Sequence, residues 1–345
     1  MYRSLQLAEL GAGLVAPNPM VGAVLVYNDR IIGEGYHEVY GGPHAEVNCM
    51  NSVKPEDLSL IPQSAMYVSL EPCAHFGKTP PCADLIIKHQ IKKVVVGCRD
   101  PFALVDGKGI EKLRNAGVEV IINVLEEDCK TLNKRFFCFH TKQRPYIILK
   151  WAQSADGFIA GAENGKRTFI SNSISNRLVH KWRSEEAAIM VGTNTALQDN
   201  PSLTNRLWNG KNPLRILLDK QLKVPENFHL LDDTAPTIVF NNVKQEERGN
   251  LLYWQLNEQG DMLEQMVVAL FKKGINSVLV EGGRHLLQSF IDKGLWDEAR
   301  VITNKDLEIL EGVKAPKLKD HLKLNKTNYD TDMVSFYQNN LGFKV

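Results

Sequence analysis

The sequence contains no apolar run of the roughly 18 residues that a membrane-spanning helix requires. Its first residues, MYRSLQLAELGAG, lack the hydrophobic stretch of a secretory signal, so we expect a cytoplasmic protein with no membrane partner. Neither sign of charge is in excess, since 41 Lys and Arg stand against 40 Asp and Glu. We therefore expect no nucleic-acid partner, and any phosphate that the protein binds must be held by local groups.

Cysteine is scarce and unevenly spaced, with six residues in a chain of 345. Disulfide frameworks are typical of much shorter, cysteine-dense chains, so these residues are either small buried hydrophobic groups or metal ligands. The neighbours of each cysteine decide between the two. The six are Cys49, Cys73, Cys82, Cys98, Cys129 and Cys138.

The rest of the composition is that of an ordinary globular protein, with 43% hydrophobic and 23% charged residues. At roughly 150 residues per domain, a chain of this length predicts two domains with separate cores. The sequence shows no internal repeat and no low-complexity tract.

Residues 1–143 alternate between apolar strands and amphipathic helices, which predicts an α/β layered sheet. Asn28-Asp29 joins the first two strands, so we expect a hairpin there, while the later strands are linked by helices and can be parallel. The expected strands are 21–27, 31–36, 65–70, 93–97 and 118–122. The expected helices lie near 5–11 and 109–117, or begin at His44, Cys82 and Glu126.

A second α/β domain is expected over residues 144–345, because Pro145 interrupts a helical pattern directly before the apolar strand YIILKWA. Residues 241–263 show no clear pattern. The further strands are expected near 187–192, 214–218, 236–240 and 277–281, and the helices near 173–184, 261–273 and 283–292.

Three potential metal ligands stand at the starts of helices or the end of a strand in the first domain. His44 opens one helix, Cys73 follows a strand in Glu71-Pro72-Cys73, and Cys82 opens another helix. One imidazole and two thiolates suit tetrahedral Zn²⁺ and leave a fourth position for water, as in catalytic sites. Glu46, two residues after His44, can reach that water without being a ligand and can carry a proton from it to a leaving amine.

A structural zinc knuckle, or buried cysteines without a metal, would be the simpler interpretation of any one of these residues. All four positions occur in the order of the zinc deaminase signature, H-x-E followed by P-C and a second cysteine, which favours the catalytic site. We expect the other four cysteines to be packing residues.

The cysteine spacing departs from the short form of that signature, because the eight residues AHFGKTPP separate Cys73 from Cys82. This longer loop and the segment Asn18 to Ala23 resemble the pyrimidine deaminase domain of a bifunctional riboflavin biosynthesis family, over most of residues 1–140. The resemblance implies a cytidine-deaminase-like fold and substrate contacts from Asn18, His75 and Lys78, the last two to a phosphate. Asn18 could instead be a turn residue before Pro19.

Several polar segments of the second domain follow its strands. They are Lys150 to Gly157, Val191 to Thr195, Asp199 to Arg206, and Glu281-Gly282-Gly283. Two glycines between a strand and a helix allow a phosphate to approach free backbone N–H groups, although the same pair is often only a tight turn. No GxGxxG follows the first strand, so a Rossmann domain is disfavoured.

Together these segments resemble the reductase half of the same family over roughly residues 145–320, which implies a dihydrofolate-reductase-like fold. Two guanidinium groups can bind a ribose phosphate, and a carboxylate can accept hydrogen bonds from sugar hydroxyls or ring N–H groups. By position, the resemblance implies NADP contacts from Ala152, Phe169, Thr195, Asp199, Gly283, Arg284, His285, Leu286, Leu287, Gln288 and Ser289. It implies substrate contacts from Arg167, Arg183, Leu203, Arg206 and Glu281.

Simpler roles are open for some of these residues: Arg183 could lie on the surface, Leu203 in the core, and Asp199 in a capped turn. The sequence also departs from the family pattern at Arg167, usually a small polar residue, and at Phe169, often Trp. Residues 304–312 lack the usual proline- and glycine-rich run.

The resemblance implies a bifunctional enzyme of riboflavin biosynthesis, with Zn²⁺ and NADPH as cofactors. It would deaminate 2,5-diamino-6-(5-phosphoribosylamino)pyrimidin-4(3H)-one hydrolytically and then reduce the ribosyl group to ribityl. Its partner would be this small phosphorylated pyrimidine, and a homo-oligomer is compatible with the sequence. Two alternatives are a nucleoside or tRNA deaminase with an appended domain, which would have the short cysteine spacing, and a zinc-stabilised nucleic-acid-binding module, which the net charge of +1 disfavours.

Overall fold

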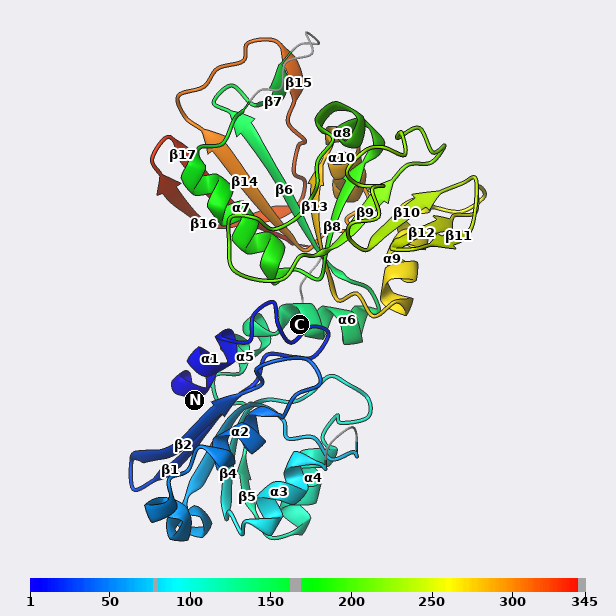
Figure 1. The fold of residues 1–345 in the computed structure, drawn as a ribbon. Coiled ribbons are helices and arrows are strands. Elements are labelled where there is room, and N and C mark those ends of the chain that lie inside the picture. The colour runs from blue at the N-terminus through cyan, green and yellow to red at the C-terminus, as the bar shows by residue number, and fades with distance from the viewer. Residues whose placement is uncertain (77–79, 162–168, 341–345) are drawn as a thin grey trace. The chain divides into compact units, whose positions relative to one another are not determined.

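The computed structural model describes residues 1–76, 80–161 and 169–340. The chain divides into two compact units, Met1–Gln143 and Arg144–Val345 (Figure 1). Among the described residues, no helix combines the length and the hydropathy that crossing a membrane requires.

The first unit is built on a five-stranded sheet of order β2-β1-β3-β4-β5. Asn28 and Asp29 both have positive φ, 46° and 60°, as the tight turn of a two-residue hairpin requires, and β1 pairs with β2 antiparallel. β3, β4 and β5 are parallel, so the expected hairpin and the expected parallel strands are both confirmed. The strands are β1 (Gly22–Tyr27), β2 (Arg30–Tyr36), β3 (Ala65–Leu70), β4 (Lys93–Cys98) and β5 (Glu119–Ile121).

Helices cover both faces of this sheet and create two apolar cores. On one face, α2, α3, α4 and a 3₁₀ helix pack on Leu25, Met66, Val68 and Val94. On the other face, α1 lies so close to β1 that a Cβ at Gly22 would come within 2.0 Å of the Ser4 carbonyl oxygen. The bounds are α1 (Tyr2–Glu9), α2 (Ala45–Asn51), η1 (Pro55–Gln63), α3 (Cys82–Lys88), α4 (Lys108–Asn115), α5 (Glu126–Leu132) and α6 (Lys134–Lys142).

The second unit is built on a ten-stranded sheet of order β11-β12-β10-β9-β8-β13-β6-β14-β17-β16. From β12 to β14 the neighbouring strands are parallel, and β11, β17 and β16 add antiparallel edges. A separate pair, β7 (Phe158–Gly161) and β15 (Gly312–Lys314), is antiparallel. The ten strands are β6 (Tyr146–Ser154), β8 (Ala188–Gly192), β9 (Leu214–Leu218), β10 (Thr237–Asn241), β11 (Glu246–Arg248), β12 (Leu251–Gln255), β13 (Ser277–Gly282), β14 (Glu298–Asn304), β16 (His321–Tyr329) and β17 (Asp332–Asn339).

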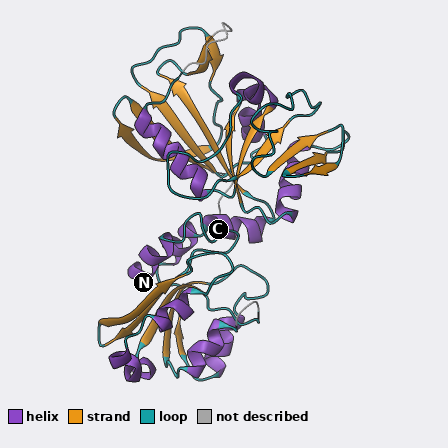
Figure 2. Cartoon of the chain, viewed as in Figure 1, coloured by secondary structure: helices purple, strands orange, loops and turns teal. Residues whose placement is uncertain are grey.

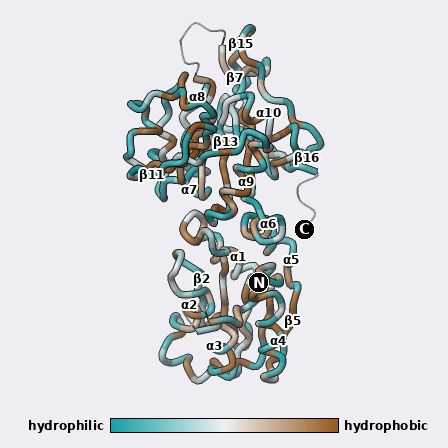
Figure 3. Tube along the Cα trace, turned by 90° about the vertical axis from the view of Figure 1, so that its right-hand side faces the viewer, coloured by the Kyte–Doolittle hydropathy of each residue, from teal (hydrophilic) through white to brown (hydrophobic). Residues whose placement is uncertain are grey.

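Helices lie on both faces of the larger sheet (Figure 2). α9 (Met262–Lys272) and α10 (Arg284–Asp292) share one core with alternate residues of β6, β8, β9 and β13. α7 (Ser173–Glu185) and α8 (Thr193–Asp199) cover the other face. Hydrophobic residues follow the interior strands, including β13 (Figure 3). Because the central strands are parallel, the ends of β6, β8, β9 and β13 meet at one edge of the sheet, where ligands of α/β proteins bind.

Most of the expected elements are present to within a few residues, and the helix expected near residues 5–11 spans Tyr2–Glu9. The sequence did not reveal β14, because two of its buried positions are charged: Glu298 and Arg300 are joined by a 2.6 Å hydrogen bond. It did not reveal β16 either, because this edge strand is exposed along almost its whole length and shows no alternation. α8 is short and begins with the polar residues Thr-Asn-Thr, which favour turns.

Removing a large side chain from the core of the second unit should destabilise that unit. Phe290 on α10 is fully buried, so Phe290→Ala leaves a cavity and should lower the free energy of unfolding by about 3–5 kcal/mol. Chemical denaturation followed by fluorescence measures this. Val268→Ala is the control, because Val268 on α9 is 47% exposed and should change stability little. A similar midpoint for the two variants would contradict the assignment of Phe290 to the core.

Candidate active sites

Three potential metal ligands meet in the first unit. His44 Nδ1 lies 3.4 Å from Cys82 Sγ and 3.6 Å from Cys73 Sγ, and all three ligand atoms lie within 4.8 Å of one another. Tetrahedral zinc, with bonds of about 2.3 Å to sulfur and about 2.0–2.1 Å to nitrogen, places such atoms about 3.6 Å apart. The three residues therefore fit a zinc ion in both chemistry and spacing.

The local fold fixes the positions of these ligands. His44 precedes α2 in extended conformation, and Cys82 is the first residue of α3. Cys73 lies in the loop after β3 and is tied to the start of α3 by two backbone donors: the N–H of Cys82 donates to Cys73 Sγ over 3.3 Å, and the N–H of Ala83 donates to the Cys73 carbonyl over 3.1 Å. Hydrogen bonds from the start of α3 thus join two of the three segments that carry the ligands.

One thiol of the cluster ionises far more readily than the other. Hydrogen bonds from Cys82 and His44 lower the pKa of Cys73, despite its burial, and the resulting thiolate raises the pKa of Cys82. Glu46, in the first turn of α2, is buried, and burial with the nearby Cys73 charge raises its pKa to about 7. A carboxyl group with that pKa can both accept and release a proton near neutral pH.

Glu71 is a residue whose importance the sequence reasoning missed. Its buried carboxylate accepts backbone N–H groups of Gly107 at 3.0 Å, Gly109 at 2.9 Å, Asp100 at 3.3 Å and Ile110 at 3.3 Å. These bonds hold the loop before α4 and its first turn on Glu71, and Gly109 packs against the Pro72 carbonyl. The position next to Pro72-Cys73 was visible in the sequence, but its partners lie about 30 to 40 residues away.

The structure describes two of the three residues that the sequence predicts around the pyrimidine, Asn18 and His75. His37 is buried and its Nδ1 lies 2.9 Å from the Pro43 carbonyl, so Nδ1 carries the hydrogen and Nε2 accepts from the Asn18 amide at 3.1 Å. This fixes the Asn18 amide nitrogen on His37 and leaves its oxygen for other partners. His75 has a buried Nδ1 for which the described residues provide no hydrogen bond. Lys78 lies outside the described residues.

A buried ion pair lies at the edge of the larger sheet. Arg183 on α7 donates through Nε and Nη2 to the two carboxylate oxygens of Glu281 on β13, both at 2.8 Å, and Lys150 Nζ lies 3.7 Å from Glu281. Although burial opposes ionisation, the charges of Arg183 and Lys150 lower the pKa of Glu281 to about 2. Arg183 is therefore not a surface arginine, and Lys150, for which the sequence reasoning gave no role, belongs to this group.

The same helix fixes the segment that carries Arg206. The backbone N–H of Arg206 donates to His180 Nδ1 over 2.9 Å, and Arg183 Nη1 donates to the Thr204 carbonyl over 3.2 Å. The Arg206 side chain is exposed, and its Nη1 donates to the Thr204 hydroxyl over 3.2 Å, so the guanidinium keeps other donors for an anion. Leu203 is buried in the core with φ 53°, so a substrate contact there would come from its backbone. Arg167 lies outside the described residues.

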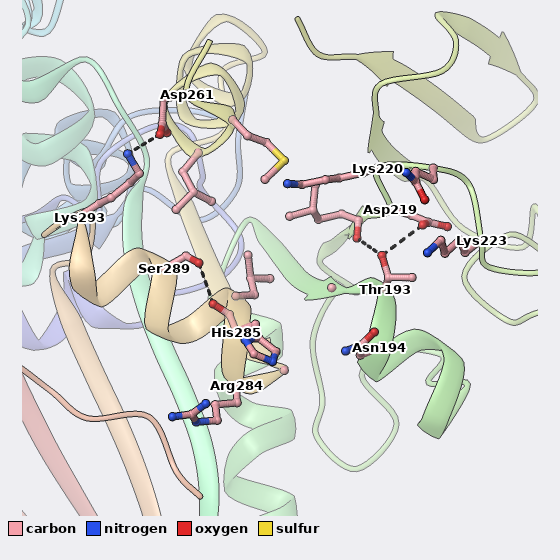
Figure 4. Close-up of a pocket in the computed structure, with 17 residues that line it drawn as sticks. Thr193, Asn194, Asp219, Lys220, Lys223, Asp261, Arg284, His285, Ser289 and Lys293 are labelled. Carbon is pink, nitrogen blue, oxygen red and sulfur yellow. Dashed lines mark hydrogen bonds and ion pairs between the residues drawn. The ribbon is translucent and has the colours of Figure 1, made fainter. Parts of the chain in front are cut away.

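A cavity of about 580 Å³ opens where β8, β9 and β13 end (Figure 4). Its lining includes much of the predicted cofactor segment: Gly283, Arg284, His285, Leu286 and Ser289. Leu287 instead faces the core, and Gln288 accepts the backbone N–H of Lys317 at 2.9 Å. The cavity therefore runs along the start of α10, where backbone N–H groups can receive a phosphate.

The other predicted cofactor contacts lie around this edge. Thr195 packs on Gly283 so closely that a Cβ added at Gly283 would come within 2.9 Å of the Thr195 hydroxyl. The neighbouring Gly282 has a φ of 139°, which favours glycine. Ala152 lies near the end of β6 and Asp199 ends α8. Phe169 is 77% exposed, so its ring offers a surface to a ligand rather than to the core.

Two family models match the chain. The model of the cytidine and deoxycytidylate deaminase zinc-binding region matches residues 1–98, and that of the RibD C-terminal domain matches residues 145–304. Among curated relatives, riboflavin biosynthesis protein RibD of Aquifex aeolicus (strain VF5) is 40% identical, covering 98% of this chain and 97% of the relative. RibD of Bacillus amyloliquefaciens is also 40% identical, covering 86% and 81%.

Solved structures agree with these matches. A diaminohydroxyphosphoribosylaminopyrimidine deaminase/5-amino-6-(5-phosphoribosylamino)uracil reductase from Thermotoga maritima is 36% identical, with a TM-score of 0.89 over 98% of this chain and 97% of that one. Acinetobacter baumannii RibD is 30% identical, with a TM-score of 0.86 over the same shares. The predicted folds of both domains are confirmed. The chain therefore belongs to the RibD family of riboflavin biosynthesis proteins, in which a deaminase domain is joined to a reductase domain.

Proposed function

We propose that this protein catalyses two successive steps of riboflavin biosynthesis. Residues 1–143 would deaminate 2,5-diamino-6-(5-phosphoribosylamino)pyrimidin-4(3H)-one, and residues 144–345 would reduce the ribosyl group of the product to ribityl with NADPH. The observation that carries the first step is the His44, Cys73 and Cys82 cluster, whose spacing suits tetrahedral zinc, beside the buried Glu46. The identity of the substrate follows from the relatives that the chain resembles.

In the deamination, the ligands hold the metal and Glu46 moves the proton. Zinc bound by His44, Cys73 and Cys82 would polarise the attacking water. Glu46 takes the proton of that water and delivers it to the departing amino group, for which its place in the first turn of α2, two residues after His44, is suited. Asn18, held by His37, would accept from the pyrimidine through its amide oxygen, and His75 and Lys78 would bind the phosphate.

In the reduction, the chain positions the sugar next to the cofactor. NADPH would supply the hydride. Arg206 would bind the ribose phosphate, while Arg183 is already paired with Glu281 and acts by holding the Thr204 carbonyl. Asp199 would assist the proton transfer that accompanies opening of the sugar ring, or orient the nicotinamide. Arg167 and Leu203 complete the proposed substrate contacts, and Ala152, Phe169, Thr195 and residues 283–289 the cofactor contacts.

We further propose, from the sequence, that the protein is cytoplasmic, has no nucleic-acid partner and can form a homo-oligomer.

Replacing Glu46 should stop deamination without removing the metal. Glu46→Gln keeps the size of the side chain but cannot carry a proton, so ammonia release should fall by a factor on the order of 10² or more. Zinc content and reduction of supplied deaminated intermediate should be unchanged. Glu56→Gln, at an exposed glutamate of the same unit, is the control. Normal ammonia release by Glu46→Gln would refute the proton-transfer role.

Each cysteine ligand should be necessary for stoichiometric zinc. In Cys73→Ser and in Cys82→Ser a hydroxyl replaces a thiolate, which is a poor substitute in a tetrahedral site, so zinc content should fall well below one per chain. Metal analysis of the purified variants measures it. Cys138→Ala removes a buried thiol elsewhere in the unit and should keep its zinc. Full occupancy in either serine variant removes that cysteine from the ligand set.

Arg206 should contribute mainly to binding of the phosphorylated substrate. Arg206→Ala removes an exposed guanidinium that the ground and transition states use alike, so KM for the deaminated intermediate should rise, on the order of tenfold, with little change in kcat. Steady-state kinetics with NADPH and this intermediate test it. Arg177→Ala, at an exposed arginine of α7, should behave as wild type. An unchanged KM in Arg206→Ala would assign the phosphate to another group.

A further inference from the structure

The segment that carries Arg206 belongs to no helix or strand. Residues 201–213 connect α8 to β9 and take part in neither kind of element. A backbone N–H outside a helix or sheet takes a side chain or water as its partner. The place of the Arg206 side chain therefore depends on the contacts that hold its own stretch of backbone.

Two side chains of α7 supply such contacts. His180 and Arg183 are three residues apart, so they lie on one face of the helix. His180 Nδ1 accepts the backbone N–H of Arg206 at 2.9 Å, and Arg183 donates to the carbonyl of Thr204 at 3.2 Å. Arg183 is itself fixed by its ion pair with Glu281. The bond from Arg206 to His180 thus acts on the residue that carries the exposed guanidinium.

The surroundings of His180 favour a neutral imidazole. Its side chain is buried, which lowers its pKa, and the charges of Arg183 on α7 and of Arg206 lower it further. Glu281 on β13 and a hydrogen bond with the Asn205 side chain raise it by less. In a neutral imidazole with its hydrogen on Nε2, the lone pair of Nδ1 can accept a backbone N–H. Protonation would put a hydrogen on Nδ1 as well, and the acceptor would be lost.

We propose that His180 is a positioning residue of the reductase, which holds the Arg206 backbone so that the guanidinium can bind the phosphate of the substrate. It acts through one hydrogen bond, whose loss leaves the Arg206 side chain present but displaced. Because the acceptor exists only while the imidazole is neutral, binding of the phosphorylated substrate should weaken at acid pH. This inference rests on the proposed reductase function and adds the residue that places its phosphate-binding arginine.

Asparagine and glutamine at position 180 separate the hydrogen bond from the bulk of the side chain. The amide oxygen of asparagine is as far from Cβ in the chain of bonds as Nδ1 of histidine, and that of glutamine is one carbon further. In the full-length protein, His180→Asn should keep KM for the deaminated intermediate within about twofold, and His180→Gln should raise it on the order of tenfold, with little change in kcat. Steady-state kinetics with NADPH measure this. Equal KM values in the two variants would overturn the proposal.

A double variant tests whether His180 acts through Arg206. If it does, adding His180→Gln to Arg206→Ala should change KM less than about twofold, because the guanidinium is already absent. A purely structural histidine would weaken both backgrounds alike, so a full effect in the Arg206→Ala background would contradict the positioning role. Affinity for NADPH, measured by fluorescence titration, should equal that of wild type. A loss of this affinity in His180→Gln would instead assign the histidine to general support of the fold.

The pH dependence of KM is an independent measurement. In wild type, KM should rise as the pH falls from about 8 to about 5 and His180 takes up a proton. The phosphate of the substrate titrates in the same range, so the informative quantity is the ratio of KM in wild type to KM in His180→Asn, which has no titrating group at this position. The ratio should grow toward acid pH. A constant ratio would rule out the need for a neutral imidazole.

The outcomes also separate this inference from the function on which it rests. If wild type reduces the deaminated intermediate and His180→Gln keeps the wild-type KM, the positioning role is wrong while the reductase function stands. If wild type does not reduce the intermediate with NADPH, the proposed reductase function is itself wrong, and the role of His180 falls with it.

Discussion

A carboxylate that is removed from water has to be paired or hydrogen-bonded, and each unit of this protein places one such group beside its site. In the second unit, both oxygens of Glu281 are taken by Arg183, which links β13 to α7 and, through the Thr204 carbonyl, to the segment that carries Arg206. In the first unit, Glu71 takes four backbone N–H groups, two from the loop before α4 and two from the first turn of α4. Each of these two carboxylates thus fixes a segment next to the site of its unit.

The pKa of buried Glu46 is shifted in the opposite direction to that of Glu281. Glu281 is held ionised by two cations, with its pKa lowered to about 2, and it is therefore suited to structure and to a fixed negative charge. Glu46 is just as buried but lies near a thiolate, which together with burial raises its pKa to about 7. The same side chain type is thus held ionised in one place and closer to neutral in the other, and the neighbouring charges decide which.

The sequence predicted the parts of each site that are encoded locally. His44, Glu46, Cys73 and Cys82 could be found because the chemistry of zinc demands particular side chains at helix starts and after a strand. The roles of Glu71, His180 and Lys150 could not be found, because their partners are distant in sequence and only the fold brings them together. β14 was missed for a related reason, since the charged residues Glu298 and Arg300 become compatible with burial only when they pair.

A nearly neutral protein that handles phosphorylated ligands has to concentrate its cations, because no overall field assists binding. Around Arg206 in the second unit, neutral His180 on α7 accepts the Arg206 backbone N–H, and Arg183 is neutralised by Glu281. The exposed Arg206 guanidinium bonds only to the neutral Thr204 hydroxyl among the described residues and so keeps its charge for an anion. What makes this cation available is that the nearby carboxylate of Glu281 already has its partners.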